Sequence, residues 1–294
     1  NTAYNNSVRL YNNSIALGNI YGAQSHSVQA KGNVVELLTG SKAQGSVYGV
    51  HMSNALVQEN DTTVSWNTVQ TAAENNRVIL NGAEAGTATA EIAGAKNLSG
   101  WANNNLVQIT DSTATASTLA GGWAQHERQT LTASGTQNFP SGQQDLSIGY
   151  QANTNTVSAA GSTIQANVYG GLVSRQEETN PNGTPDTTLS TAWANLVHLD
   201  TSSVTGNVYG GAAMGDYTSA KYNRLWLTNT QVTGSVYGGF AQGANAAAAW
   251  NQVILNNTSV SGDVYASSAA QQEGNNTVTL AGQTDISGTV YGGG

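Results

Sequence analysis

One six-residue motif recurs through this chain at a nearly constant interval. It reads GSVYGG at Gly234, and close copies begin at Gly18, Gly206, Gly262 and Gly288. The tyrosines of the last four copies stand 28, 28 and 26 residues apart, at Tyr209, Tyr237, Tyr265 and Tyr291. A unit of this length with only short apolar segments cannot bury them alone and must stack on its neighbours.

A second motif, Asn-x-apolar-x-apolar, precedes each of these tyrosines by 14 or 15 positions. Its copies begin at Asn6, Asn33, Asn76, Asn105, Asn155, Asn195, Asn223, Asn251 and Asn276, with a degenerate copy at Gln129. Alternation of period two is the strand signature. Each unit therefore reads as strand, turn, strand, glycine corner and strand, followed by a variable stretch.

The stacked solution is an all-β fold, a parallel β-helix (β-solenoid) of about ten coils in which equivalent residues lie about 4.8 Å apart. We predict four inward ladders. The first two run from Val8 to Val278 and from Leu10 to Leu280 through the Asn-strands; the third contains Ile164, Val204, Val232, Val260 and Ile286, and the fourth contains Ile20, Val47, Val168, Val208, Val236, Val264 and Val290. The recurring asparagines should form an amide ladder, each bonded to the next coil's copy.

We expect residues 1–294 to form a single β-helix. Loop outgrowths are predicted near 50–75 and 172–192, because Asn33 to Asn76 and Tyr169 to Tyr209 are 43 and 40 residues apart. The second outgrowth contains VSRQEETNPNGTPD, a run rich in turn residues. Because the chain starts at Asn1 without a leader, we expect it to be a processed piece of a longer protein.

Composition excludes several partners. With 9 basic and 17 acidic residues and a net charge of −8, the chain is unsuited to nucleic acid. It contains no run of about 18 apolar residues, so we expect no membrane insertion by this fragment. The absence of cysteine removes thiol catalysis and zinc–thiolate sites.

Two aromatic stripes accompany the motifs. The first contains Tyr21, Tyr48, Tyr169, Tyr209, Tyr237, Tyr265 and Tyr291; the second, just before the asparagines, contains Tyr4, Trp66, Trp101, Trp193, Tyr222 and Trp250. Stacked rings that join coil to coil are one interpretation, and an exposed surface for sugars or a partner protein is the other. The candidate ligand-binding residues are Tyr169, Tyr209, Tyr237, Tyr265, Trp193, Tyr222, Trp250 and Arg175, the last at the start of the loop from Arg175 to Asp186.

The main alternative function is a polysaccharide-degrading enzyme. A glycosidase would need two carboxylates about 5–10 Å apart. The candidate carboxylates Asp111, Asp145, Asp200, Asp216, Asp263 and Asp285 share no repeat column. The one candidate catalytic cluster of acidic and basic residues that lie close in sequence contains Asp216, Lys221 and Arg224. No His-Glu-x-x-His or calcium-binding repeat is present. We therefore predict no enzyme activity, no catalytic or metal site and no cofactor.

The Val-Tyr-Gly-Gly corners, the preceding Asn-x-Val-x-Leu strands and the lack of cysteine resemble the passenger region of Gram-negative autotransporters, the type V secreted surface proteins. The resemblance covers nearly the whole chain and is clearest from Asn195 to Gly294. It implies a right-handed β-helix at the bacterial cell surface, exported and anchored through a C-terminal barrel outside this chain. Some members carry serine protease subdomains, but their Gly-Asp-Ser-Gly motif is missing here.

The resulting hypothesis is an extracellular adhesin rod. The family implies adhesion, self-association or biofilm formation, so the expected partner is a host surface protein or glycan, or the same protein on a neighbouring cell. A polysaccharide-degrading enzyme and a stalk without a ligand site remain the alternatives.

Overall fold

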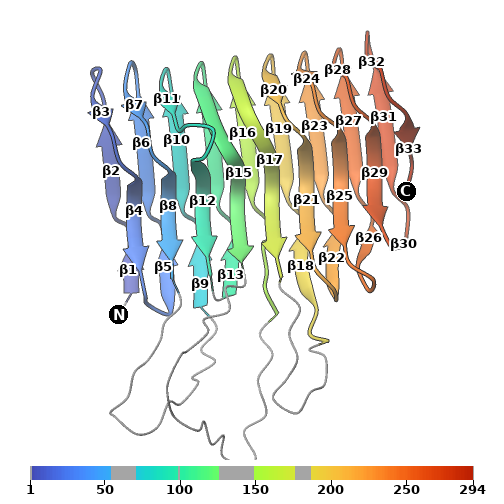
Figure 1. Cartoon of the computed structure of the whole chain (residues 1–294), viewed down its shortest axis with the longest axis horizontal. Coiled ribbons are helices and arrows are strands. Elements are labelled where there is room, and N and C mark those ends of the chain that lie inside the picture. The colour runs from blue at the N-terminus through green and yellow to red at the C-terminus, as the bar shows by residue number, and fades with distance from the viewer. Residues whose placement is uncertain (1, 54–70, 99, 126–148, 176–186, 294) are drawn as a thin grey trace, which may run out of the picture.

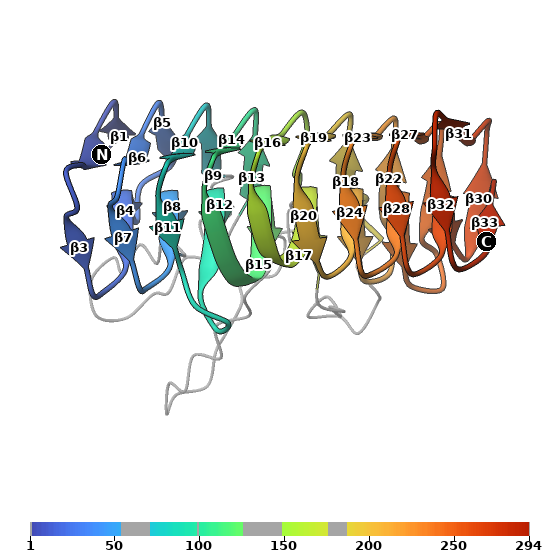
Figure 2. The same ribbon diagram turned by 90° about the horizontal axis from the view of Figure 1, so that it is seen from above.

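The computed structural model describes residues 2–53, 71–98, 100–125, 149–175 and 187–293, and these form a right-handed parallel β-helix (Figure 1). Every strand pair in it is parallel. Seen from above, the coils stack along one axis with their strands aligned (Figure 2). The described residues form nine coils, one for each strand of the nine-stranded sheet. The degenerate copy at Gln129, which brought the predicted number to about ten, lies outside the described residues.

Each coil has three faces. The first face contains β1 (Thr2–Tyr4), β5 (Gln29–Lys31), β9 (Thr71–Glu74), β13 (Gly100–Asn103), β18 (Ser190–Trp193), β22 (Thr218–Lys221), β26 (Ala247–Ala249) and β30 (Gln271–Glu273). Bridges from Trp101 to Gln151 and from Gln151 to Thr191 join β13 to β18. The second face contains β2 (Ser7–Leu10), β6 (Val34–Leu38), β10 (Arg77–Asn81), β14 (Leu106–Thr110), β16 (Thr156–Ala160), β19 (Leu196–Asp200), β23 (Arg224–Thr228), β27 (Gln252–Asn256) and β31 (Thr277–Ala281).

The third face is a sixteen-stranded sheet with two arms. Its first arm contains β3 (Ile15–Ala16), β7 (Lys42–Ala43), β11 (Glu84–Ala85), β20 (Ser203–Thr205), β24 (Gln231–Val232), β28 (Ser259–Val260) and β32 (Asp285–Ile286). Its second arm contains β4 (Ile20–Ser25), β8 (Val47–Met52), β12 (Glu91–Asn97), β21 (Val208–Met214), β25 (Val236–Gln242), β29 (Val264–Ala269) and β33 (Val290–Tyr291). The long strands β15 (Thr113–Gln125) and β17 (Thr163–Ser174) run through both arms.

The predicted inward ladders are confirmed by the strand register. Val197, for example, pairs with Val157 on one side and Leu225 on the other, and all three are fully buried. The third ladder extends further than predicted, because Ala16, Ala43, Ala85 and Ala114 continue it into the N-terminal coils. Ile92 and Leu119 likewise fill the fourth ladder between Val47 and Val168. Together these columns form the main core.

A second core lies where we predicted only a variable stretch. Alanines of the first face, among them Ala30, Ala73 and Ala192, pack against the end of the second arm and are fully buried. Small side chains let the first face approach that arm closely. The sequence of the first face therefore shows little of the alternating apolar pattern by which a strand is recognised. The stretch before each asparagine, which the sequence marked only as variable, therefore contains a first-face strand in most of the described coils.

The asparagine ladder is confirmed. The amide of Asn195 donates to the side-chain oxygen of Asn223 at 3.0 Å, and Asn223 donates to that of Asn251 at 3.0 Å. The backbone N–H of Asn195 donates to the same oxygen of Asn223 at 3.0 Å. The side chains are buried, so each amide satisfies polar groups that would otherwise lie unpaired in the interior.

The glycines after the tyrosines are explained by close approach of neighbouring coils. A Cβ on Gly210 would lie 2.4 Å from the carbonyl oxygen of Gly238, and one on Gly211 would lie 2.3 Å from the amide oxygen of Asn223. Neither Gly210 nor Gly211 therefore has room for a side chain, and the second of them makes room for the asparagine ladder. In other coils Val50, Ala95 and Ser267 take the position of the second glycine.

The predicted outgrowths fall largely outside the described residues, at 54–70 and 176–186. The described chain leaves the second arm after Ser53 and Arg175, and returns at Thr71 and Thr187. The gaps therefore begin at one edge of the third face.

Candidate functional site

The first aromatic stripe is a ladder of stacked rings. Tyr169 and Tyr209 have ring centroids 4.7 Å apart, and stacking continues through Tyr237 and Tyr265 to Tyr291 at 4.5–4.9 Å. Tyr169 and Tyr209 are only 7% and 8% exposed. Tyr237 and Tyr265 are half-buried. For the two buried rings the stacking interpretation holds, and they are poorly placed to bind a ligand.

The burial of these rings comes from the strand itself. Residues three positions after the tyrosines turn back over the rings, as Phe240 does against Tyr237 at a centroid distance of 5.4 Å. Leu172 and Ala212 belong to the same outer apolar cluster. Burial raises the pKa of Tyr169 above the ordinary tyrosine value, and the neighbouring Tyr209 adds to this shift.

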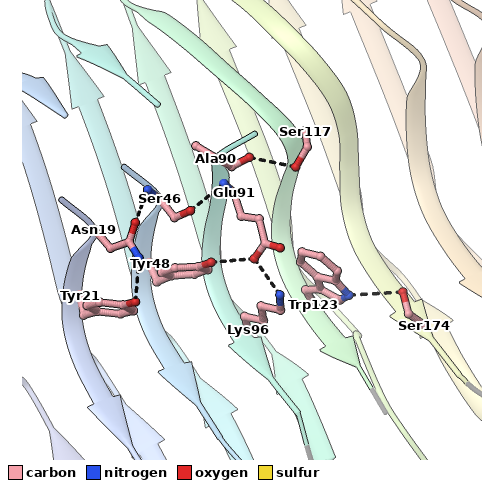
Figure 3. Close-up of polar contacts among 10 residues, drawn as sticks. All are labelled: Asn19, Tyr21, Ser46, Tyr48, Ala90, Glu91, Lys96, Ser117, Trp123 and Ser174. Atoms are coloured by element: carbon pink, nitrogen blue, oxygen red, sulfur yellow. Dashed lines mark hydrogen bonds and ion pairs between the residues drawn. The ribbon is translucent and has the colours of Figure 1, made fainter. Parts of the chain in front are cut away.

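The tyrosine ladder is interrupted in the third and fourth coils, where Ala93 and Ala120 take the tyrosine position. Figure 3 shows what fills the gap. The Nζ of Lys96 lies 2.7 Å from Oε2 of Glu91 and 4.0 Å from the ring centre of Trp123. The hydroxyl of Tyr48 donates to the same oxygen of Glu91 at 2.6 Å.

This polar group is enclosed. Lys96 and Trp123 are each 9% exposed, and the indole N–H of Trp123 donates to Ser174 at 3.3 Å. Burial, followed by the hydrogen bond and the charge of Glu91, raises the pKa of Tyr48. We interpret the group as a structural replacement for two missing rings, because a polymer could not reach it.

The second aromatic stripe behaves differently, because its members at the corner between the first and second faces are exposed. Trp193, Tyr222 and Trp250 are 44%, 51% and 46% exposed. Tyr222 stacks on Trp250 with centroids 6.2 Å apart and meets Trp193 edge to face at 5.9 Å. We call these three residues the corner aromatic cluster.

The backbone at this corner is left-handed. Tyr222 and Trp250 have φ of 59° and 58°, and the equivalent positions of other coils, also at positive φ, hold Asn5, Gly32, Asn75, Asn104, Thr154 and Ala194. Asparagine and glycine tolerate this conformation, whereas a bulky aromatic residue is unusual there. Two aromatic residues therefore occupy strained positions in which their rings project into solvent.

A neighbouring group on the second face was not predicted from the sequence. Trp226 is 38% exposed, stacks on His198 with centroids 4.8 Å apart, and has the guanidinium carbon of Arg224 5.3 Å from its ring centre. The signal was present in NRLWL, where tryptophan stands at an outward x position of the Asn-strand. The motif itself marks only the inward residues, so it gives no sign of which outward residues are aromatic.

The remaining predicted site residue, Arg175, is buried rather than displayed. It is 8% exposed, and its guanidinium donates to the backbone oxygen of Thr188. A second contact reaches the backbone oxygen of Tyr217 at 3.4 Å. These bonds tie the end of β17 to the start of the next described segment.

The candidate acidic and basic residues have separate partners. Lys221 pairs with Glu273 at 2.8 Å, Arg224 lies over Trp226, and Asp216 accepts from the backbone N–H of Asn245 at 2.9 Å. Asp263 accepts from the backbone N–H of Thr289. Among the described residues no three His, Asp or Glu side chains are placed to hold a metal ion, and no helix could cross a membrane.

The chain matches no protein-family model, no curated protein and no solved structure. We therefore infer function from the exposed residues of the structure.

Proposed function

We propose that this chain is an attachment rod of a bacterial cell surface, of the autotransporter passenger type, and that it makes contact through the corner aromatic cluster. The rod provides a rigid, repetitive support, and the cluster provides exposed rings at one level of it. Large exposed aromatic surface on a soluble protein usually marks an interaction site.

The observation that carries this proposal is the strained backbone under exposed rings. Tyr222 and Trp250 are the bulky residues at left-handed positions that the other coils fill with asparagine, glycine, Thr154 or Ala194. Such a conformation costs about 1–2 kcal/mol for a residue with a side chain. About half of each residue stays exposed, so ring burial is a weak reason to keep an aromatic residue at a strained position, whereas binding a partner is a stronger one.

The test compares non-adherent cells that display the wild-type chain with cells that display the double variant Tyr222→Asn and Trp250→Asn. Asparagine fits the left-handed corner, so we expect the free energy of unfolding to change by less than about 1 kcal/mol, with relieved strain offsetting the lost ring contact. Clustering of the cells and their adhesion to cultured epithelial cells should fall to background.

Tyr4→Ser is the matched control, since Tyr4 is an equally exposed tyrosine near the corner of the first coil. It should leave attachment unchanged. A folded double variant that attaches as well as wild type would contradict the role of the cluster, and a wild-type chain that attaches to nothing would contradict the function itself.

A further inference from the structure

Arg224 is an exposed cation whose guanidinium lies over the ring of Trp226. It stands on β23 two residues after Tyr222 of the corner cluster and two residues before Trp226. Its register neighbours on the second face are Leu196 and Gln252, neither of which is charged. The guanidinium therefore lies on a surface of rings, an amide and an aliphatic side chain.

Three of the chain's other surface cations have an acidic partner. Arg9 pairs with Glu36, Lys42 with Glu84 and Lys221 with Glu273, each across coils. Within the described residues Arg224 makes no ion pair, although the chain carries 17 acidic residues. An unpaired guanidinium presents a planar fork of donors that matches a carboxylate.

The surroundings of Arg224 favour a saccharide over a peptide. β23 is paired on both edges, with β19 and β27, so no backbone groups are free to add a peptide strand. Rings of Tyr222, Trp226 and Trp250 offer apolar area to the C–H groups of a sugar, and Gln252 offers an amide. A carboxylate-bearing sugar would use all of these features at once.

We propose that Arg224, with Trp226 and the adjoining corner aromatic cluster, forms a binding site for a carboxylated saccharide of the sialic acid or uronic acid class. The guanidinium holds the carboxylate in a charge-assisted hydrogen bond, and the rings contact the sugar. This assignment rests on the proposed attachment function and specifies its ligand.

The chain supplies a matched control for this site. Arg77 occupies the same column of the second face in the third coil, and it is also exposed and without an ion pair among the described residues. Two residues later this coil has Ile79 in place of Trp226, and Asn75 stands at the corner in place of Tyr222. Arg77 is thus the same cation without the aromatic surroundings.

The experiment is calorimetric titration of the purified chain with 3′-sialyllactose, with trigalacturonate, with lactose and with a hexaglutamate peptide. We expect at least one acidic saccharide to bind and lactose and the peptide to bind at least about tenfold more weakly. Arg224→Gln should weaken the acidic saccharide about tenfold or more, and Arg224→Lys should weaken it less. Arg77→Gln should leave the affinity unchanged.

The two saccharide arms distinguish a sialic acid from a uronic acid. Equal affinity in Arg224→Gln and wild type would overturn the proposal, as would tighter binding of the peptide or of lactose. Cell attachment that survives Arg224→Gln but is lost with the corner cluster would overturn this ligand assignment while leaving the attachment function standing.

Discussion

The tyrosine ladder and the corner aromatic cluster contain similar side chains in similar stacks, yet one is covered and the other is open. Tyr169 and Tyr209 lie where the strand bends and later residues such as Leu172 pack beside the rings. Tyr222 and Trp250 project from a left-handed corner and are about half exposed among the residues that the structure describes. The position of a ring on the coil, rather than its stacking, separates a structural aromatic from a candidate binding residue.

The largest expected effect comes from the covered stripe. Tyr209→Ala should lower the free energy of unfolding by about 3–5 kcal/mol, because it removes a buried ring and two stacking contacts. Urea unfolding followed by circular dichroism measures this loss. Trp250→Ala, which removes an exposed ring, should cost less than about 1 kcal/mol. Equal losses for the two variants would abolish the distinction drawn between the stripes.

The interruption of the ladder gives the next effect. Lys96→Met leaves the Glu91 carboxylate without its cation, so we expect destabilisation at the lower end of about 3–5 kcal/mol, since the hydroxyl of Tyr48 remains. Adding Glu91→Gln should recover much of the loss. Lys42→Met, in an exposed pair, should change stability by no more than about 1 kcal/mol. If Lys96→Met left the free energy of unfolding unchanged, the ion pair would not be a structural replacement for the missing rings.

Alkaline pH should produce the smallest and most gradual effect. The raised pKa of Tyr169 means that the folded chain favours the neutral phenol. This contribution to stability is fully present below the ordinary tyrosine pKa of about 10 and is lost as pH rises above it, by at most about 1.4 kcal/mol per pH unit. The melting temperature between pH 8 and pH 11.5 measures it, and Tyr169→Phe should flatten the decline. If the melting temperature of Tyr169→Phe fell with pH as steeply as that of wild type, groups other than Tyr169 would cause the decline.

Much of the fold could be predicted from the sequence, because in a solenoid the residues that stand one repeat apart in the sequence pair with each other in neighbouring coils. Val197 and Leu225 occur 28 residues apart and pair in the structure. The first face was missed for the opposite reason. Alanines such as Ala192 and Ala220 pack by being small, and small residues leave no hydrophobic period to detect.

The candidate site was only partly predictable. The position of Trp193, Tyr222 and Trp250 before the asparagines marked them as a stripe, but sequence spacing alone did not separate their exposure from the burial of Tyr209. Exposure depends on the direction in which the chain turns between faces. Trp123 and Lys96 stand three residues after the tyrosine position, outside the six-residue motif, so only the three-dimensional register reveals their role.

The asparagine ladder gives the rod a direction as well as a core. In each amide pair from Asn6 to Asn251 the donor lies in one coil and the acceptor in the following coil, so the amide dipoles point the same way along the axis. Aligned hydrogen bonds polarise one another, so a central amide is held by neighbours on both sides and a terminal one by a single neighbour. The molecule is thus a one-dimensional cooperative chain, whose opening starts at its ends and whose middle coils exchange their amide protons last.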